Sequence, residues 1–156
     1  MRVVVTFLIG VACATAAWAR DSKDAEPPRR YGVPADLETY PQDKPQNTLK
    51  SVLLAIDRGR IDYLLAQLAD PEWVDDRVRS VHDGKFHDMV KETTDQLSHD
   101  PDAIKQLRRF LRDGDWKEGD DRASAQLKGV KERVHFRKVR DRWYFENQQK
   151  APAEDK

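Results

Sequence analysis

The sequence is poor in cysteine and carries no net charge. Its 156 residues include a single cysteine, Cys13, and 28 basic residues balance 28 acidic ones at pH 7. One cysteine excludes a disulfide-stabilised scaffold. The neutral balance removes the attraction that draws proteins to nucleic acid or to an anionic membrane. Hydrophobic residues make up 38 % of the chain, which is enough for one modest domain that packing alone must stabilise.

Long hydrophobic runs are scarce, and the one that is present lies at the N-terminus. Arg2 precedes an apolar run over residues 3–12, and small residues follow up to Ala19. This order predicts a signal peptide over residues 1–19, cleavage after Ala19 and export to the periplasm or the extracellular space. A membrane-spanning helix needs about 20 strongly apolar residues, so we expect no membrane span in the mature chain. The alternative is a lipoprotein anchored at Cys13.

Residues 20–47 have the composition of a linker. They hold five of the eight prolines and few large apolar residues. Proline removes backbone donors and favours extended chain, so we predict a proline-rich disordered linker here. The alternative is an arm that docks a partner through Tyr31, Leu37 and Tyr40. The polar end of the chain, residues 150–156, is predicted to be a disordered tail.

Between residues 48 and 113, apolar residues recur three and four positions apart, which is the spacing of one helix face. Five such stripes predict helices over residues 48–58, 61–69, 71–81, 86–97 and 101–113. Asn47 or Thr48 can cap the first helix. Asp70-Pro71 and Asp100-Pro101 each place a capping aspartate before a proline, a common helix start. Residues 71–81 are compatible with either a helix or a strand, and the spacing of their valines favours a short helix.

After Gly114 the apolar period changes from about 3.6 to 2, the period of a half-buried strand. The alternation predicts an antiparallel meander of three short strands, with an optional earlier strand around Trp116. The alternating apolar residues are Ala123, Ala125, Leu127, Val134, Phe136, Trp143 and Phe145. Helices first and strands last indicate an α+β fold, in which N-terminal helices pack on a C-terminal sheet.

Two segments carry a more specific pattern. Residues 53–70 read LLAIDRGRIDYLLAQLAD, a helix pair, and residues 134–147 read VHFRKVRDRWYFEN, an aromatic hairpin. They resemble the opening helices and the terminal hairpin of nuclear-transport-factor-2-like (polyketide-cyclase/SnoaL-like) domains, and the ending is similar to that of secreted bacterial proteins without known activity. The resemblance implies a domain over residues 48–149 whose curved sheet wraps the helices as a cystatin-like cone, often around a pocket. Arg140-Asp141 departs from the Asp-Gly turn of that family, and the helical residues 71–111 stand where it has early strands.

Aromatic residues are the best candidates for a site or a core. At their spacings they are more often packed core than pocket lining, and both alternatives stay open. The candidates are Tyr63, Trp73, Phe110, Trp116, Phe136, Trp143 and Phe145.

Motifs for catalysis and metal binding are missing from the sequence. No serine lies in a Gly-x-Ser-x-Gly turn, and no glycine-rich loop is present to hold phosphate. The histidines do not have the spacing of a metal pair; they are His82, His87, His99 and His135. We therefore predict no catalytic residue, no cofactor and no metal. Acidic residues nearby offset the basic residues 133–142, so we expect no nucleic-acid partner.

These observations predict an exported, non-catalytic domain that binds a small ligand or a protein, with a homodimer formed through the outer sheet face. The alternative is a small-molecule enzyme of isomerase, cyclase or dehydratase type that uses a polar residue inside the cone. A third hypothesis is a structural protein of the cell envelope, held by its N-terminal arm. Fold resemblance does not supply a function, so the choice among these three hypotheses depends on the geometry of the site.

Mass spectrometry of the mature protein tests the N-terminal prediction. We expect a chain that begins at Arg20, because the small-residue cleavage pattern ends at Ala19. A mature chain that begins at an acylated Cys13 would instead establish the lipoprotein alternative.

Overall fold

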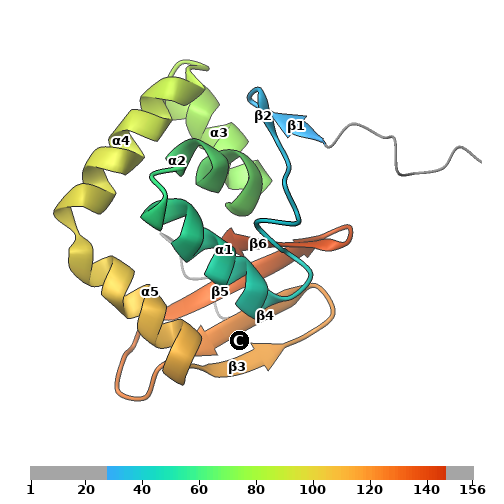
Figure 1. Ribbon diagram of the computed structural model, residues 1–156, viewed down its shortest axis with the longest axis vertical. Helices are drawn as coiled ribbons and strands as arrows, with labels where there is room; N and C mark the ends of the chain where they lie inside the picture. The colour runs from blue at the N-terminus through green and yellow to red at the C-terminus, as the bar shows by residue number, and fades with distance from the viewer. Residues whose placement is uncertain (1–27, 147–156) are drawn as a thin grey trace, which may run out of the picture.

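The computed structural model describes residues 28–146, so the predicted signal peptide, Cys13, residues 20–27 of the predicted linker and the predicted tail lie outside the described residues. Helices precede a four-stranded antiparallel sheet and pack on it, which confirms the predicted α+β fold (Figure 1). In chain order the elements are β1 (Arg29–Arg30), β2 (Val33–Pro34), α1 (Pro45–Asp57), α2 (Ile61–Tyr63), the π-helix η2 (Leu64–Leu68), α3 (Pro71–Val81), α4 (Phe86–His99), α5 (Pro101–Asp113), β3 (Asp115–Glu118), β4 (Arg122–Gln126), β5 (Arg133–Val139) and β6 (Arg142–Glu146).

The sheet is a meander in the strand order β3-β4-β5-β6. Phe136 pairs with Ala123 on one side and with Phe145 on the other, so the apolar alternation places these residues on the face that meets the helices. Trp116 lies on β3, the optional earlier strand. Two residues join β5 to β6, and Arg140 takes a φ of 56° there, a left-handed conformation that glycine would adopt with less strain.

Aspartate–proline pairs start α3 and α5 as predicted. The Asp70 carboxylate accepts hydrogen bonds from two first-turn backbone N–H groups at 2.8 and 3.2 Å, and Pro71 takes the first helical position. Residues 71–81 are therefore a helix and not a strand. α1 begins at Pro45, earlier than the predicted Thr48, because a proline in the first turn lacks only an N–H that the helix leaves unpaired.

Residues 28–47 of the predicted linker pack against the helices, which corrects the prediction of disorder over this range. β1 and β2 form a short hairpin, and the buried ring of Tyr40 lies 4.2 Å from that of Tyr63. The Ser51 hydroxyl on α1 donates to the carbonyl of Pro41 at 2.9 Å. Prolines that suit the folded geometry restrict the unfolded chain more than the folded one, so a proline-rich composition is compatible with this packing.

A turn of π-helix positions the buried Gln67. The backbone N–H that follows η2 donates to the carbonyl five residues earlier, at 2.8 Å. The Gln67 amide donates to the carbonyls of Val33 at 2.8 Å and Pro28 at 3.2 Å, both in the N-terminal segment. Its side-chain oxygen accepts from Nη2 of Arg142 at 3.1 Å. Gln67 therefore connects the N-terminal segment to β6.

Gln42 completes this group, which we call the glutamine network: Gln42, Gln67 and Arg142. The Gln42 amide donates to the carbonyl of Gln67 at 3.0 Å and to that of Trp143 at 2.8 Å. Its side-chain oxygen accepts from Nε of Arg142 at 3.1 Å, and the backbone N–H of Trp143 donates to the Gln42 carbonyl at 2.9 Å. The N-terminal segment thus covers the edge of β6 at Trp143, and the residues after η2 cover it at Phe145, where the Asp70 backbone N–H donates to the Phe145 carbonyl at 2.8 Å.

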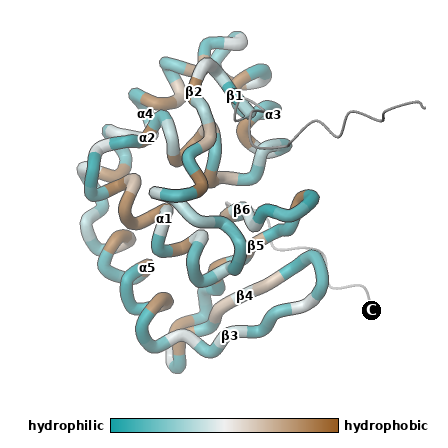
Figure 2. Tube along the Cα trace, turned by 45° about the vertical axis from the view of Figure 1, so that its right-hand side comes forward, coloured by the Kyte–Doolittle hydropathy of each residue, from teal (hydrophilic) through white to brown (hydrophobic). Residues whose placement is uncertain are grey.

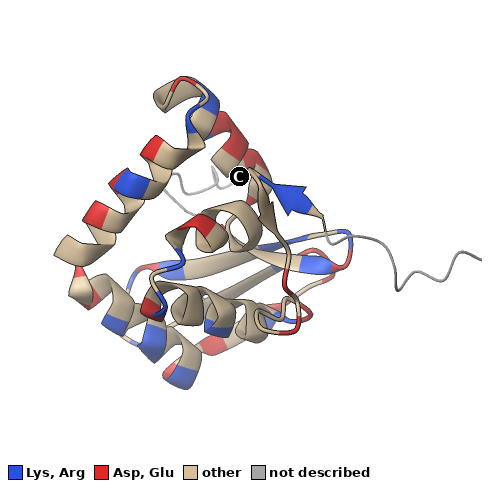
Figure 3. Cartoon of the chain, turned by 45° about the horizontal axis from the view of Figure 1, so that its top comes forward, with Lys and Arg blue, Asp and Glu red and all other residues tan. Residues whose placement is uncertain are grey.

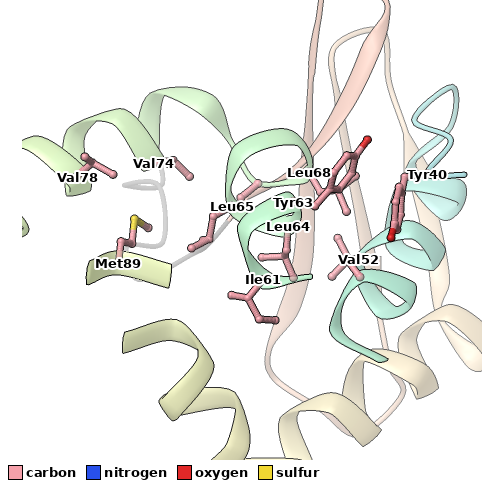
Figure 4. Packing of buried hydrophobic residues seen from close by; sticks show 12 residues of the cluster. Tyr40, Val52, Ile61, Tyr63, Leu64, Leu65, Leu68, Val74, Val78 and Met89 are labelled. Carbon is pink, nitrogen blue, oxygen red and sulfur yellow. The ribbon is translucent and has the colours of Figure 1, made fainter. Parts of the chain in front are cut away.

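Two hydrophobic clusters lie on either side of α1. Val52 belongs to the helical cluster with α2, η2, α3 and α4 (Figure 4), whereas Leu49 and Leu53 belong to the sheet cluster with α5 and β4–β6. Figure 2 shows apolar and polar residues alternating along the helices, and Figure 3 shows charged residues spread along α4 and α5. Because α1 serves both clusters, it holds the helices and the sheet together.

Substitution of Gln67 by methionine tests the glutamine network. The change keeps the side-chain volume but removes the donor to the carbonyls of Val33 and Pro28 and the acceptor of Arg142, and the loss of a buried hydrogen-bond partner costs about 1–3 kcal/mol. We expect the free energy of unfolding, measured in urea, to fall by about 2 kcal/mol. Gln106→Met on α5 is the control, because the Gln106 side chain makes no hydrogen bond within residues 28–146. An equal effect of the two substitutions would contradict this role.

Candidate functional site

A partly open pocket of about 230 Å³ lies between the helical cluster and the α4–α5 pair. Helices α1, η2, α3, α4 and α5 and strand β6 all contribute residues to its wall. The apolar part of the wall consists of Val52, Ile56, Leu64, Leu65, Ala69, Leu97, Leu107 and Phe145. An apolar cavity with a few polar groups at one side is the usual form of a small-molecule site.

The pocket exists because α4 and α5 are anchored at opposite ends. Met89, near the start of α4, and Phe110, near the end of α5, are the residues that these two helices bury fully. Between these anchors Leu97 and Leu107 are only partly buried. In Figure 1 the two helices form the outer wall, with their junction away from α1. The middle of the wall therefore does not close on the core.

Polar side chains from α3 and α4 line one side of the pocket. Oε1 of Glu92 accepts hydrogen bonds from Nη2 of Arg77 at 3.3 Å and from Nε2 of Gln96 at 2.9 Å. Nε2 of His82, whose side chain is 8 % exposed, lies 3.2 Å from Oε2 of Glu92, although its direction does not fit a hydrogen bond. The Arg77 guanidinium lies 5.9 Å from the centre of the Trp73 ring, within the range of a cation–π contact.

The structure divides the predicted aromatic residues between pocket and core. Trp73 and Phe145 line the pocket. The remainder lie in the two clusters or pack against them; they are Tyr63, Phe110, Trp116, Phe136 and Trp143. Phe136 stands 5.5 Å from the Trp116 ring and 5.6 Å from the Phe145 ring. The inner face of the sheet is thus filled by aromatic side chains.

The polar residues of the pocket, Arg77 and Glu92, were missed by sequence reasoning. The spacing of Trp73 and Arg77, four residues apart on one predicted helix, could have shown that the two share a face. The contact of Arg77 with Glu92 depends on how α3 packs against α4, and no local pattern carries that information. The sequence could have indicated a buried polar role for Gln67, because it is the one strongly polar residue in the apolar stretch 64–69.

The outer face of the sheet presents a polar row. Lys117, Ser124, His135 and Glu146 pair directly across the four strands, beside an open groove of about 260 Å³. Nη1 of Arg122 binds Oε1 of Glu146 at 2.9 Å. Within residues 28–146 the side chains of Ser124 and His135 make no hydrogen bond, so a serine, a histidine and a carboxylate share a row without forming a catalytic relay.

The part of the chain that the structure describes contains no group of three or more side chains suited to hold a metal ion. Among the same residues no helix is long and apolar enough to cross a membrane. Comparison of the chain with protein-family models, with curated proteins and with solved structures finds no match. The function must therefore be argued from the geometry of the site.

The pKa of His135 provides a test of the outer face. Burial lowers this pKa below its ordinary value of 6.5; Glu146 opposes the shift, and Arg133 and Arg122 add to it. A depressed folded-state pKa makes protonation favour the unfolded chain, so the contribution of His135 to stability is present above pH 6.5 and is lost as the pH falls through the folded-state pKa. We expect an NMR titration of the His135 ring to show a midpoint below 6.5, and His135→Gln to flatten the fall in stability at acid pH. A midpoint at or above the ordinary value would contradict the burial of the ring.

Proposed function

We propose that this protein is a non-catalytic binding domain that takes a small, largely apolar ligand in the pocket between α1, α3, α4 and α5. The observation that carries the proposal is the pocket itself, with a volume of about 230 Å³ and a mainly aliphatic wall. An apolar cavity of about 150 Å³ in another protein is already large enough to bind benzene. The pocket therefore has room for a ring with a short chain attached.

The state of the buried polar groups favours binding over catalysis. The Tyr63 hydroxyl accepts from the backbone N–H of Asp36 at 2.9 Å and donates to the Asp36 carbonyl at 3.2 Å. Asp70 caps α3, and Gln42 and Gln67 belong to the glutamine network. The enzyme alternative needs a polar residue inside the cone, whereas aromatic residues of the sheet cluster occupy that space. These groups already have structural partners, which supports a binding role.

The proposal also covers the type of fold, the export of the protein and its surfaces for partners. The likeness of residues 53–70 and 134–147 to nuclear-transport-factor-2-like domains supports a cone of that type, and the pattern of residues 1–19 supports export. Of the residues in the predicted docking arm, Tyr40 is buried, whereas Tyr31 and Leu37 are exposed. The outer sheet face carries the polar row. A homodimer through that face would therefore be held together by polar contacts.

Isothermal titration calorimetry with butylbenzene, a neutral single ring with a short chain, tests the proposal. We expect saturable binding to the full chain, because the apolar wall of the pocket accepts a probe of this size. Thr93→Trp places a large ring in the pocket wall from a half-buried position on α4, and we expect it to weaken probe binding at least tenfold.

Thr94→Trp is the matched control, since Thr94 is the next residue of α4 and is exposed outside the pocket lining. Its affinity for the probe should equal that of the unmodified protein. Equal probe binding by the Thr93→Trp protein, or no saturable binding to the unmodified one, would overturn the proposed function.

A further inference from the structure

Arg77 is the strongest polar group in the pocket, and most of its bonding capacity is unused. A guanidinium carries five N–H donors. Within the described residues Arg77 makes one hydrogen bond, to Glu92, and its length of 3.3 Å is slightly longer than the usual range. The side chain is 29 % exposed and lies over the Trp73 ring. The Trp73 ring lies within cation–π range of the guanidinium, and the N–H donors that do not bind Glu92 have no partner among residues 28–146.

Glu92, by contrast, is already well supplied with partners. Its carboxylate accepts from Arg77 and Gln96, and the His82 ring stands 3.2 Å away. Both hydrogen bonds end on Oε1, and the His82 ring lies beside Oε2. The Arg77 charge offsets the Glu92 charge. This side of the pocket consequently has spare donors and no net negative charge.

We infer that the ligand is a small monocarboxylic acid with an apolar body, a conclusion that rests on the proposed function. Its carboxylate takes two parallel N–H donors of Arg77, the geometry in which guanidinium and carboxylate fit best. Its body lies against Leu64, Leu65 and Phe145, which line the same pocket. The volume of about 230 Å³ limits this body to a single ring or a short chain.

An amine of the same size fits the site less well. Its ammonium group would approach the positive charge of Arg77, and the Glu92 charge that could attract it is already offset by that guanidinium. A neutral alcohol can use the apolar wall but forms weaker hydrogen bonds with the guanidinium than a carboxylate does. The order of affinity for one apolar body should therefore be acid, then alcohol, then amine.

Isothermal titration calorimetry with three probes of one apolar body tests the inference. The probes are 4-phenylbutyrate, 4-phenyl-1-butanol and 4-phenylbutylamine at neutral pH. We expect the acid to bind at least about tenfold more tightly than the alcohol, because hydrogen bonds to charged groups are the stronger ones. Equal affinity of acid and alcohol, or tightest binding of the amine, would overturn the inference.

Two variants locate the carboxylate. Arg77→Gln should weaken acid binding at least about tenfold and alcohol binding much less, because the alcohol is held mainly by the apolar wall; retained alcohol binding also shows that the pocket remains intact. Arg79→Gln is the control, because Arg79 lies on the exposed side of α3 and pairs with Asp76. Glu92→Gln frees the guanidinium from a competing acceptor and should tighten acid binding severalfold. Unchanged acid binding in Arg77→Gln, or weaker acid binding in Glu92→Gln, would count against the assignment.

The outcome also separates this inference from the proposed function. Binding of the neutral butylbenzene probe without preference for the acid would overturn the carboxylate ligand and leave the binding pocket in place. Failure of that probe and of all three phenylbutyl compounds would overturn both.

Discussion

The buried glutamine network is the constraint on which the rest of the structure depends. Gln67 bonds the N-terminal hairpin and Arg142, and Gln42 bonds the backbone of η2 and β6. Buried amide groups are costly without partners, so these bonds form together or not at all. They hold the N-terminal segment against β6 and place η2 beside the same strand. The helical cluster and the sheet cluster therefore meet at this junction.

The pocket is a consequence of how the helices are tied down. α1 is held on both sides, by the helical cluster and by the sheet cluster, and cannot move outward. α4 and α5 each bury one residue fully, Met89 and Phe110, and their adjoining ends pack only partly on the core. A connection anchored only at its ends is also the part of a fold that opens most easily. A ligand that enters there reaches Arg77 and the leucines of η2 together.

Local sequence patterns predicted most of the helices and strands correctly. They failed where the structure depends on contacts between residues far apart in the sequence. The Asp70-Pro71 pair and the valines of α3 predicted that helix, and the alternation around Phe136 predicted the sheet, because both signals act over a few residues. The proline content of residues 28–47 suggested disorder, because composition does not show that Gln67 supplies donors to two of their carbonyls. The π-turn was missed for the same reason, since its apolar spacing also fits a regular helix.

The sequence by itself determined that this is a neutral chain without a disulfide framework, with helices before an antiparallel sheet and with aromatic residues for a core. Hydrophobic period and capping chemistry are local properties, so they can be recognised without coordinates. Only the tertiary structure decided that most of the aromatic residues fill the core, whereas Trp73 and Phe145 reach a pocket. It also decided that Arg77 and Glu92 meet there. The meeting of side chains from different helices depends on packing angles and anchor points, which are properties of the whole fold.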